Sequence, residues 1–254
     1  MSGRYPLRVT VGSGGSMRFL RLGGILVVTT FCGLAGCSGD ISNPISRKLN
    51  WFHYVAGDSL RDNCRPGALD QYRLVYNANW DEQVRAYDLR ESALKDGSAV
   101  LFTQVFGGGY GFNVSNFTLN DVFSPTSGKS GQVRLTADQY TAVVGAINAS
   151  GFGQPAPKGL RLESYDFYWV VSACVNGQFH FNAWRFPSER FEATGPFASQ
   201  LFALDGTGVP PNWPRRQNSA EAYSQTEIPR STTYGGTPYT FELIVGDNGL
   251  AGLP

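Results

Sequence analysis

The stretch "SYDFYWVVSACVNGQFHFNAW", residues 164–184, carries the clearest structural signal in the sequence. The dipeptide Asn176-Gly177 lies between two runs that are rich in β-branched and aromatic residues. Asn-Gly in this setting is the strongest short-range signal for a β-hairpin, because both positions of its two-residue turn need a positive φ. A two-residue turn would place Cys174 opposite Phe179.

Both faces of this hairpin carry apolar side chains. Cross-strand partners share a face and successive residues alternate between faces. One face would hold Val170, Cys174, Phe179 and Phe181. The other would hold Trp169, Val171 and Trp184, together with His180 and Asn182. We therefore expect the hairpin to be covered on both sides.

Three segments upstream also have the pattern of strands. Gln71–Asn77 alternates large apolar residues with others, "NANW" supplies a turn, and Gln83–Leu89 resumes the pattern, which predicts a second hairpin. Ser98–Phe106 is more continuously apolar, as expected of a strand inside the sheet.

One main helix is expected after Thr136. Thr136 is an N-cap residue and Gln139 occupies the reciprocal position of a capping box. Gly151 suits the left-handed position just past the helix end. Four apolar residues recur at helical spacing: Tyr140, Val143, Val144 and Ile147.

The C-terminal third has weaker patterns. A short helix is predicted near Pro196–Leu204, an extended tail from about residue 209, and a last strand within Pro238–Gly246. The expected class is α+β, with an antiparallel sheet of hairpins, one main helix packed on it, and a long extended C-terminal tail.

The composition agrees with one domain that is rich in strands and loops. Charged residues make up 16% of the 254 residues, against roughly 25% in average soluble proteins. Aromatic residues reach 13%, and Gly (31) is abundant. Neither a basic stripe nor a polybasic run occurs in the sequence, so nucleic acid is not expected as a partner.

The N-terminal segment reads as a secretory signal. From Met17 the sequence is "MRFLRLGGILVVTTFCGLAGC", with two arginines, an apolar run from Leu22 to Phe31, and then small residues. The apolar run is shorter than the ~20 residues that a membrane span needs. We expect residues 1–36 to precede the mature protein as its signal peptide. Within this segment, we expect Met17 to be the true start of translation.

The tetrapeptide "LAGC", Leu34–Cys37, resembles the lipobox of bacterial lipoproteins. The resemblance implies that Cys37 receives a diacylglyceryl group, becomes the mature N-terminus and is acylated. Ser38 then favours the outer membrane of the envelope. Residues 37–50 would form the lipidated N-terminus and tether, and 51–254 a single domain. The alternatives are a signal anchor, or a plain secretory signal that happens to contain Cys.

The remaining cysteines are Cys64 and Cys174, because Cys32 leaves with the signal and Cys37 carries the lipid. In an exported, oxidising compartment such a pair predicts a disulfide bond. Two buried free thiols are the alternative.

The sequence predicts no catalytic, metal or cofactor site. Its two histidines, His53 and His180, are far apart, and a structural hydrogen bond is expected for His180. The glycine-rich residues 107–117 lack the lysine and helix of a phosphate-binding loop. The carboxylates Asp81, Glu82, Glu163 and Asp166 are expected at the surface.

Aromatic residues in or beside loops offer one binding hypothesis. They could fill the core, or they could form a surface for a glycan or an envelope protein. The candidates are Trp51, Tyr54, Trp80, Tyr110 and Trp213.

A second, looser likeness covers the globular part. The succession of the capped helix, the aromatic hairpin and a "W…P…GPF…L" segment resembles a pattern in uncharacterised bacterial envelope proteins, and it implies no activity. The segment rests on Trp184, Pro187, Gly195, Pro196 and Phe197.

The expected function is that of a membrane-anchored envelope lipoprotein. Its N-terminal lipid would bind the membrane, and its domain would have a non-catalytic binding or scaffolding role with no cofactor. Two alternatives are a periplasmic hydrolase acting on cell-wall or sugar substrates, and a subunit of a larger surface or filament assembly.

Overall fold

The computed structural model describes residues 51–80, 82–106, 128–216 and 241–252. All of them belong to the second of two compact units of the chain, Ser38–Pro254. The predicted signal peptide, lipidation site and tether lie outside the described residues, as do the glycine-rich residues 107–117 and much of the predicted tail.

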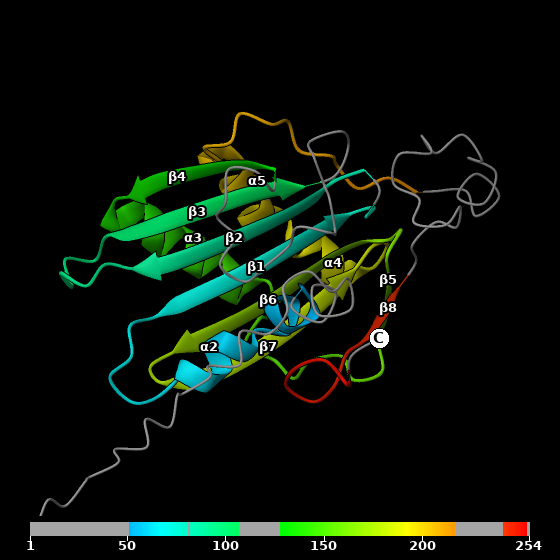
Figure 1. The fold of residues 1–254 in the computed structure, drawn as a ribbon, viewed down its shortest axis with the longest axis horizontal. Coiled ribbons are helices and arrows are strands. Elements are labelled where there is room, and N and C mark those ends of the chain that lie inside the picture. The colour runs from blue at the N-terminus through cyan, green and yellow to red at the C-terminus, as the bar shows by residue number, and fades with distance from the viewer. Residues whose placement is uncertain (1–50, 81, 107–127, 217–240, 253–254) are drawn as a thin grey trace, which may run out of the picture. The chain divides into compact units, whose positions relative to one another are not determined.

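The centre of the domain is a six-stranded antiparallel sheet with the strand order β4-β3-β2-β1-β6-β7 (Figure 1). Its strands are β1 (Gln71–Ala78), β2 (Val84–Glu91), β3 (Ala99–Phe106), β4 (Lys129–Leu135), β6 (Phe167–Val175) and β7 (Gln178–Arg185). β1 to β4 follow one another as a meander, and the β6–β7 hairpin adds to the free side of β1. The predicted α+β class is confirmed.

The hairpin predicted from Asn176-Gly177 is confirmed with its register. Asn176 has a φ of 52° and Gly177 a φ of 75°, as the turn requires. Cys174 lies opposite Phe179. The three upstream strands are also confirmed, and β3 lies inside the sheet between β2 and β4.

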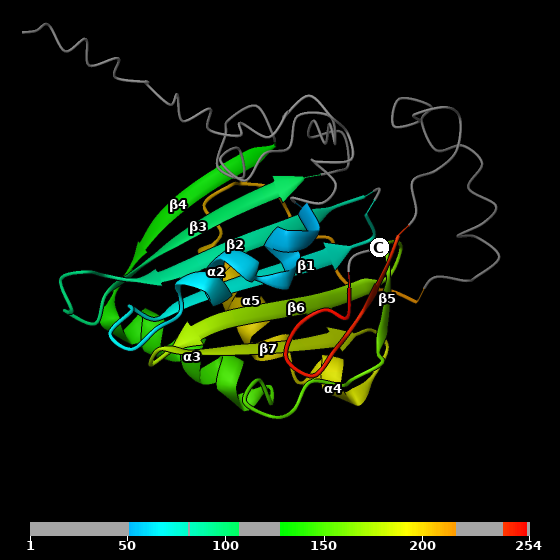
Figure 2. The same ribbon diagram turned by 60° about the horizontal axis from the view of Figure 1, so that its bottom comes forward.

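Helices cover one face of the sheet (Figure 2). The predicted main helix is α3 (Ala137–Ala149), with both bonds of the Thr136–Gln139 capping box, and Gly151 follows it with a φ of 85°. The predicted second helix is α5 (Gly195–Leu204), which packs beside α3. Between them in the chain lies α4 (Glu189–Glu192), which the sequence did not predict. A core that includes Trp169, Val143 and Phe197 fills the space under these helices.

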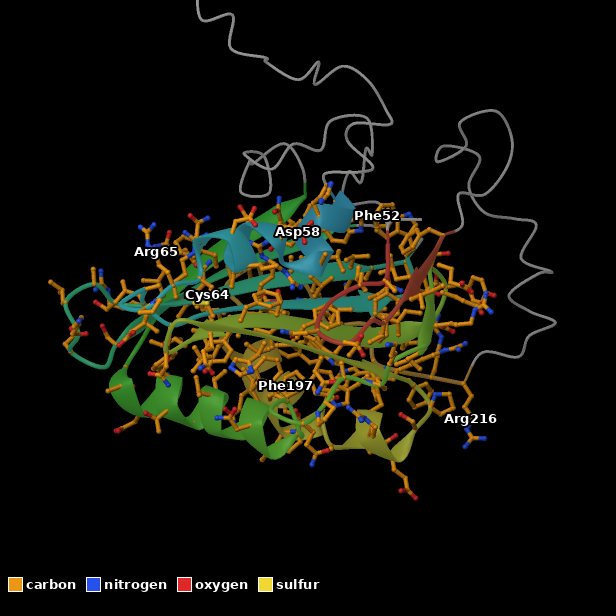
Figure 3. All side chains as sticks on the ribbon, turned by 90° about the horizontal axis from the view of Figure 1, so that it is seen from below. Phe52, Asp58, Cys64, Arg65, Phe197 and Arg216 are labelled. Carbon is orange, nitrogen blue, oxygen red and sulfur yellow. A yellow bond between two sulfur atoms is a disulfide. The ribbon has the colours of Figure 1, made fainter. Side chains whose placement is uncertain are left out.

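The opposite face is covered by different segments. Residues 51–56 are helical, and α2 (Asp58–Asn63) follows them directly. A small two-stranded sheet, β5 (Arg161–Glu163) with β8 (Glu242–Ile244), lies on the same face. Figure 3 views the sheet from its edge, with Phe52 and Asp58 on one side and Phe197 on the other. The prediction that the hairpin is covered on both sides is therefore confirmed.

Candidate functional site

A cleft with a volume of about 740 Å³ lies at the end of β7, the edge strand of the sheet. Its size falls within the range of ligand pockets, roughly 300–1,000 Å³. Arg185, Phe186 and Pro187 line it at the point where β7 ends. Residues around Tyr165, Arg190 of α4, and residues 215–216 also line it.

Asp166 and Arg185 join two sides of this cleft as a bidentate pair. Arg185 Nε lies 2.8 Å from Asp166 Oδ2, and Arg185 Nη2 donates to Asp166 Oδ1 at 3.2 Å. Asp166 Oδ2 also accepts the backbone N–H of Glu163 at 3.0 Å. Burial raises the pKa of Asp166 and outweighs the lowering by the Glu163 amide and by Arg185. The Asp166 side chain is 13% exposed and both of its oxygens accept hydrogen bonds, which corrects its predicted surface position.

Ser188 positions α4 against the cleft. Its hydroxyl donates to the carbonyl of Arg185 at 2.8 Å and accepts the N–H of Phe191 at 3.1 Å, which caps the helix. This places Arg190 on the wall of the cleft. Arg190 Nη2 donates to the buried Asn182 Oδ1 at 3.0 Å.

Hydrogen bonds of Asn212 hold residues 209–216 against the domain. Its carbonyl accepts from the hydroxyl of Tyr76 at 2.8 Å, and its side-chain N–H groups donate to Ala78 O at 3.1 Å and Glu82 Oε2 at 2.6 Å. Arg215 forms an ion pair with Glu82 and donates to Asn212 Oδ1 at 2.9 Å. These bonds bring Arg215 and its neighbour Arg216 to the cleft.

The arrangement is suited to binding an anion. Four guanidinium groups from three segments, on Arg185, Arg190, Arg215 and Arg216, line one cleft with two carboxylates, on Glu163 and Asp166. None of the four arginines was predicted from the sequence as a site residue. The only local signal was the adjacent pair in "WPRR", because the other contributions depend on contacts between distant segments.

The predicted aromatic surface is wrong for three of its residues. Trp51, Tyr54 and Trp80 are only 5%, 2% and 6% exposed, because their rings pack together between the N-terminal helical segment and the sheet. The ring centroids of Trp51 lie 5.8 Å from Tyr54 and 5.6 Å from Trp80. Trp213 is 55% exposed and contacts Phe202 edge-on. Tyr110 lies outside the described residues.

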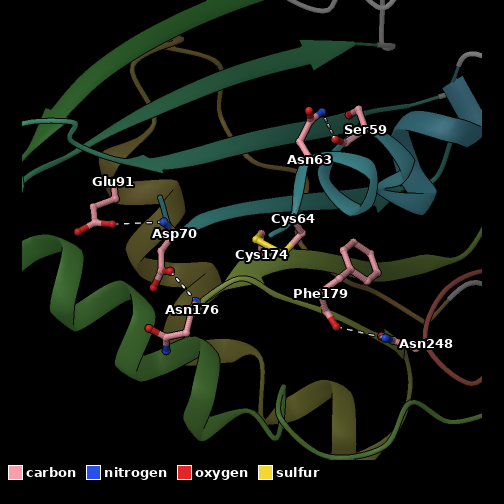
Figure 4. The surroundings of a disulfide bond; sticks show 9 residues. All are labelled: Ser59, Asn63, Cys64, Asp70, Glu91, Cys174, Asn176, Phe179 and Asn248. Atoms are coloured by element: carbon pink, nitrogen blue, oxygen red, sulfur yellow. Dashed lines mark hydrogen bonds between the residues drawn. A yellow bond between two sulfur atoms is a disulfide. The ribbon is translucent and has the colours of Figure 1, made fainter. Parts of the chain in front are cut away.

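Cys64 and Cys174 are joined in the structure by a disulfide bond, with their Cα atoms 5.4 Å apart (Figure 4). Cys64 ends α2 and Cys174 lies in β6, so the bond ties the N-terminal segment to the sheet. Nearby, Asp70 Oδ1 accepts the N–H of Asn176 at 2.8 Å and fixes the hairpin turn.

The two histidines lie apart from the cleft lining. His53 Nδ1 is hydrogen-bonded to Asp58, and both side chains are half-exposed. The imidazole of His180 makes no hydrogen bond to the described residues. It packs against Phe152 instead, which differs from the predicted structural hydrogen bond. Within the same residues no group of three or more His, Cys, Asp or Glu side chains is placed to hold a metal ion.

The fold and the cleft define a disulfide-linked α+β domain with an arginine-lined cleft at one edge of its sheet. Comparisons with protein-family models, with curated proteins and with solved structures found no match to the chain. Among the described residues, no helix is long and apolar enough to cross a membrane.

Proposed function

We propose that the chain is an exported lipoprotein of the bacterial envelope, anchored by acyl chains on Cys37, whose domain has a non-catalytic binding role. The observation that carries this proposal is the bond between Cys64 and Cys174. Disulfide bonds persist in oxidising compartments and are rare in the cytosol. The "LAGC" segment supplies the matching export and lipidation signal.

Anchoring through Cys37 would leave the domain free to bind ligands at the membrane surface. Several acyl chains on one residue hold a protein far more firmly than one, because each buried CH₂ adds about 0.8 kcal/mol. The polar residues 38–50 would connect this anchor to the domain, which begins at Trp51.

Binding is favoured over catalysis by the state of Asp166. Both of its carboxylate oxygens are engaged, by Arg185 and by the Glu163 amide. A general acid or base must reach a substrate proton, whereas both oxygens of Asp166 already accept hydrogen bonds from the protein itself. The cleft thus presents cations for binding, while its buried carboxylate has a structural role.

Mass spectrometry of the membrane-extracted protein tests the anchoring. We expect an N-terminal peptide that begins at Cys37 and carries diacylglyceryl and acyl groups. Cys37→Ser should remain unprocessed and lose these groups, whereas Cys32→Ser should be processed normally and serves as the matched control. An unmodified Cys37 in a mature membrane protein contradicts the proposal.

A hydrolase is the second candidate, because Glu163 and Asp166 line the same cleft. Glycoside hydrolysis commonly uses two such carboxylates. Incubation of the purified full chain with peptidoglycan and with oligosaccharides, followed by analysis of reducing ends, tests it. Turnover that Glu163→Gln abolishes would favour the hydrolase over the binding role.

A further inference from the structure

The positive charge of the cleft does not follow from the overall charge of the chain. Four of the 21 Lys and Arg residues precede Cys37 and none of the 20 acidic residues does, which leaves residues 37–254 with a net charge of −3. Against this acidic background, four arginines gather at one end of β7. Figure 3 shows Arg216 at this end of the domain.

Two of the four guanidinium groups are neutralised by the protein itself. Arg185 is paired with Asp166, and Arg215 is paired with Glu82. These pairs hold residues of the cleft in place. Arg185 is tied to the residue that precedes β6, and Arg215 is tied to Glu82, 133 residues earlier in the chain.

The other two guanidinium groups, on Arg190 and Arg216, remain available. Arg190 is exposed and donates one hydrogen bond, to the neutral amide oxygen of Asn182. Arg216 is exposed and has no ion-pair partner among the described residues. A guanidinium group has five N–H donors in a planar fork that matches carboxylate and phosphate oxygens. Both side chains therefore have donors to offer a ligand.

Aromatic and apolar surface lies beside these donors. Tyr165 and Phe186 line the cleft and are partly exposed. The ring of Phe186 is held by edge-on contacts with Phe167 and Phe191, whose centroids lie 6.4 and 5.4 Å away. A fixed ring that lines the same cleft as these cations provides a flat surface for a sugar or other ring of a ligand.

We propose that this cleft binds a small anionic ligand in which a phosphate or carboxylate group is attached to a sugar or similar ring. The anionic group contacts Arg190 and Arg216, and the ring lies against Tyr165 and Phe186. A cleft of about 740 Å³ accommodates a ligand of this size. The inference rests on the proposed binding role and names its ligand class.

Isothermal titration of the full mature chain in detergent tests the inference. The probes are glucose 6-phosphate, glucuronate, inorganic phosphate and uncharged glucose. We expect saturable binding of the phosphate or the carboxylate sugar, weaker binding of inorganic phosphate, and none of glucose. The two charged sugars distinguish phosphate from carboxylate as the preferred group. Affinity should fall as salt is added.

Arginine variants locate the site. Arg190→Gln and Arg216→Gln should each weaken binding by roughly 10- to 100-fold, the loss expected for a hydrogen bond between charged groups. Arg134→Gln removes the same charge from β4, the opposite edge strand, and should leave binding unchanged. All three side chains are exposed, so these variants should fold.

Three results overturn the inference: no saturable binding of either charged sugar, equal binding of glucose, or the same loss in Arg134→Gln. These outcomes are separable from failure of the proposed function. A lipidated Cys37 with an empty cleft refutes only the ligand, and an unmodified Cys37 with ligand bound refutes only the anchor. Turnover of a bound sugar would refute the non-catalytic role and leave the binding site standing.

Discussion

Asp205, the residue directly after α5, accepts a hydrogen bond from the guanidinium group of Arg85. This contact lies on the face of the sheet that α3 and α5 cover. The hydroxyl of Tyr87 donates to the same carboxylate oxygen at 3.2 Å. Arg85 is fully buried and also donates to Val209 O at 2.6 Å. This contact fixes the start of the segment that later reaches the cleft.

Asp205→Ala should therefore destabilise the domain strongly. Removing one partner leaves the Arg85 charge buried and uncompensated, which typically costs about 3–5 kcal/mol. Urea unfolding followed by circular dichroism measures the loss. Asp247→Ala is the matched control, because Asp247 pairs with Lys158 where both side chains are 70–80% exposed. That pair should contribute at most about 1 kcal/mol, and equal losses in the two variants would contradict the assigned role of Asp205.

Replacement by alanine should change the stability of the domain in opposite directions at two glycines. A Cβ on Gly131 of β4 would lie 2.4 Å from the carbonyl carbon of Gly206, so the backbone would have to shift. Overpacking of this kind costs about 1–3 kcal/mol. A Cβ on Gly145 of α3 would meet nothing within 4 Å. Gly145→Ala should stabilise the helix by about 0.5–1 kcal/mol.

Thermal unfolding of both glycine variants measures this difference. The midpoint of Gly131→Ala should fall and that of Gly145→Ala should rise. If Gly131→Ala is neutral, the segment around Gly206 does not lie against β4 as the structure describes.

The elements that the sequence predicted are those specified by neighbouring residues. The turn at Asn176-Gly177 depends on the left-handed conformation of two adjacent residues. The capping box joins Thr136 to Gln139, three positions away. In both cases the interaction is contained within one short window of sequence.

The elements that the sequence missed depend on distant contacts. Residues 51–63 form helices although "WFHYVAGD" is rich in aromatic residues, because burial of Trp51 and Tyr54 against the sheet overrides weak local propensity. The cleft forms because the side chain of Asn212 donates a hydrogen bond to the carbonyl of Ala78, which holds the tail against β1. No sequence pattern in either segment predicts this hydrogen bond.

Removal of the disulfide should lower stability substantially. Cys64 and Cys174 are 110 residues apart, and closing a loop of this length restricts the unfolded chain by about 4–5 kcal/mol in the chain-entropy model. The double variant Cys64→Ala with Cys174→Ala should unfold at a much lower guanidinium concentration than the oxidised protein, and reduction of the native protein should have a similar effect. Two alkylatable thiols in the native, unreduced protein would favour the alternative of free cysteines.

The buried tyrosines make the fold sensitive to alkali. Burial, assisted by Asp70 and Glu91, raises the pKa of Tyr72 to about 12, and burial also raises the pKa of Tyr54 and of Tyr87. In the unfolded chain tyrosine ionises near pH 10. A pKa that is raised by folding contributes stability that is complete below the unfolded pKa and is lost as pH rises towards the folded value.

We therefore expect cooperative unfolding between about pH 10 and about pH 12. Tyrosinate absorbance should rise together with the loss of near-ultraviolet circular dichroism, because the buried tyrosines ionise only as the core opens. Tyr72→Phe keeps the apolar packing of the ring and removes one late-ionising group, so its transition should move to higher pH. Ionisation of all tyrosines near pH 10 in a protein that keeps its near-ultraviolet signal would show that these side chains are not buried.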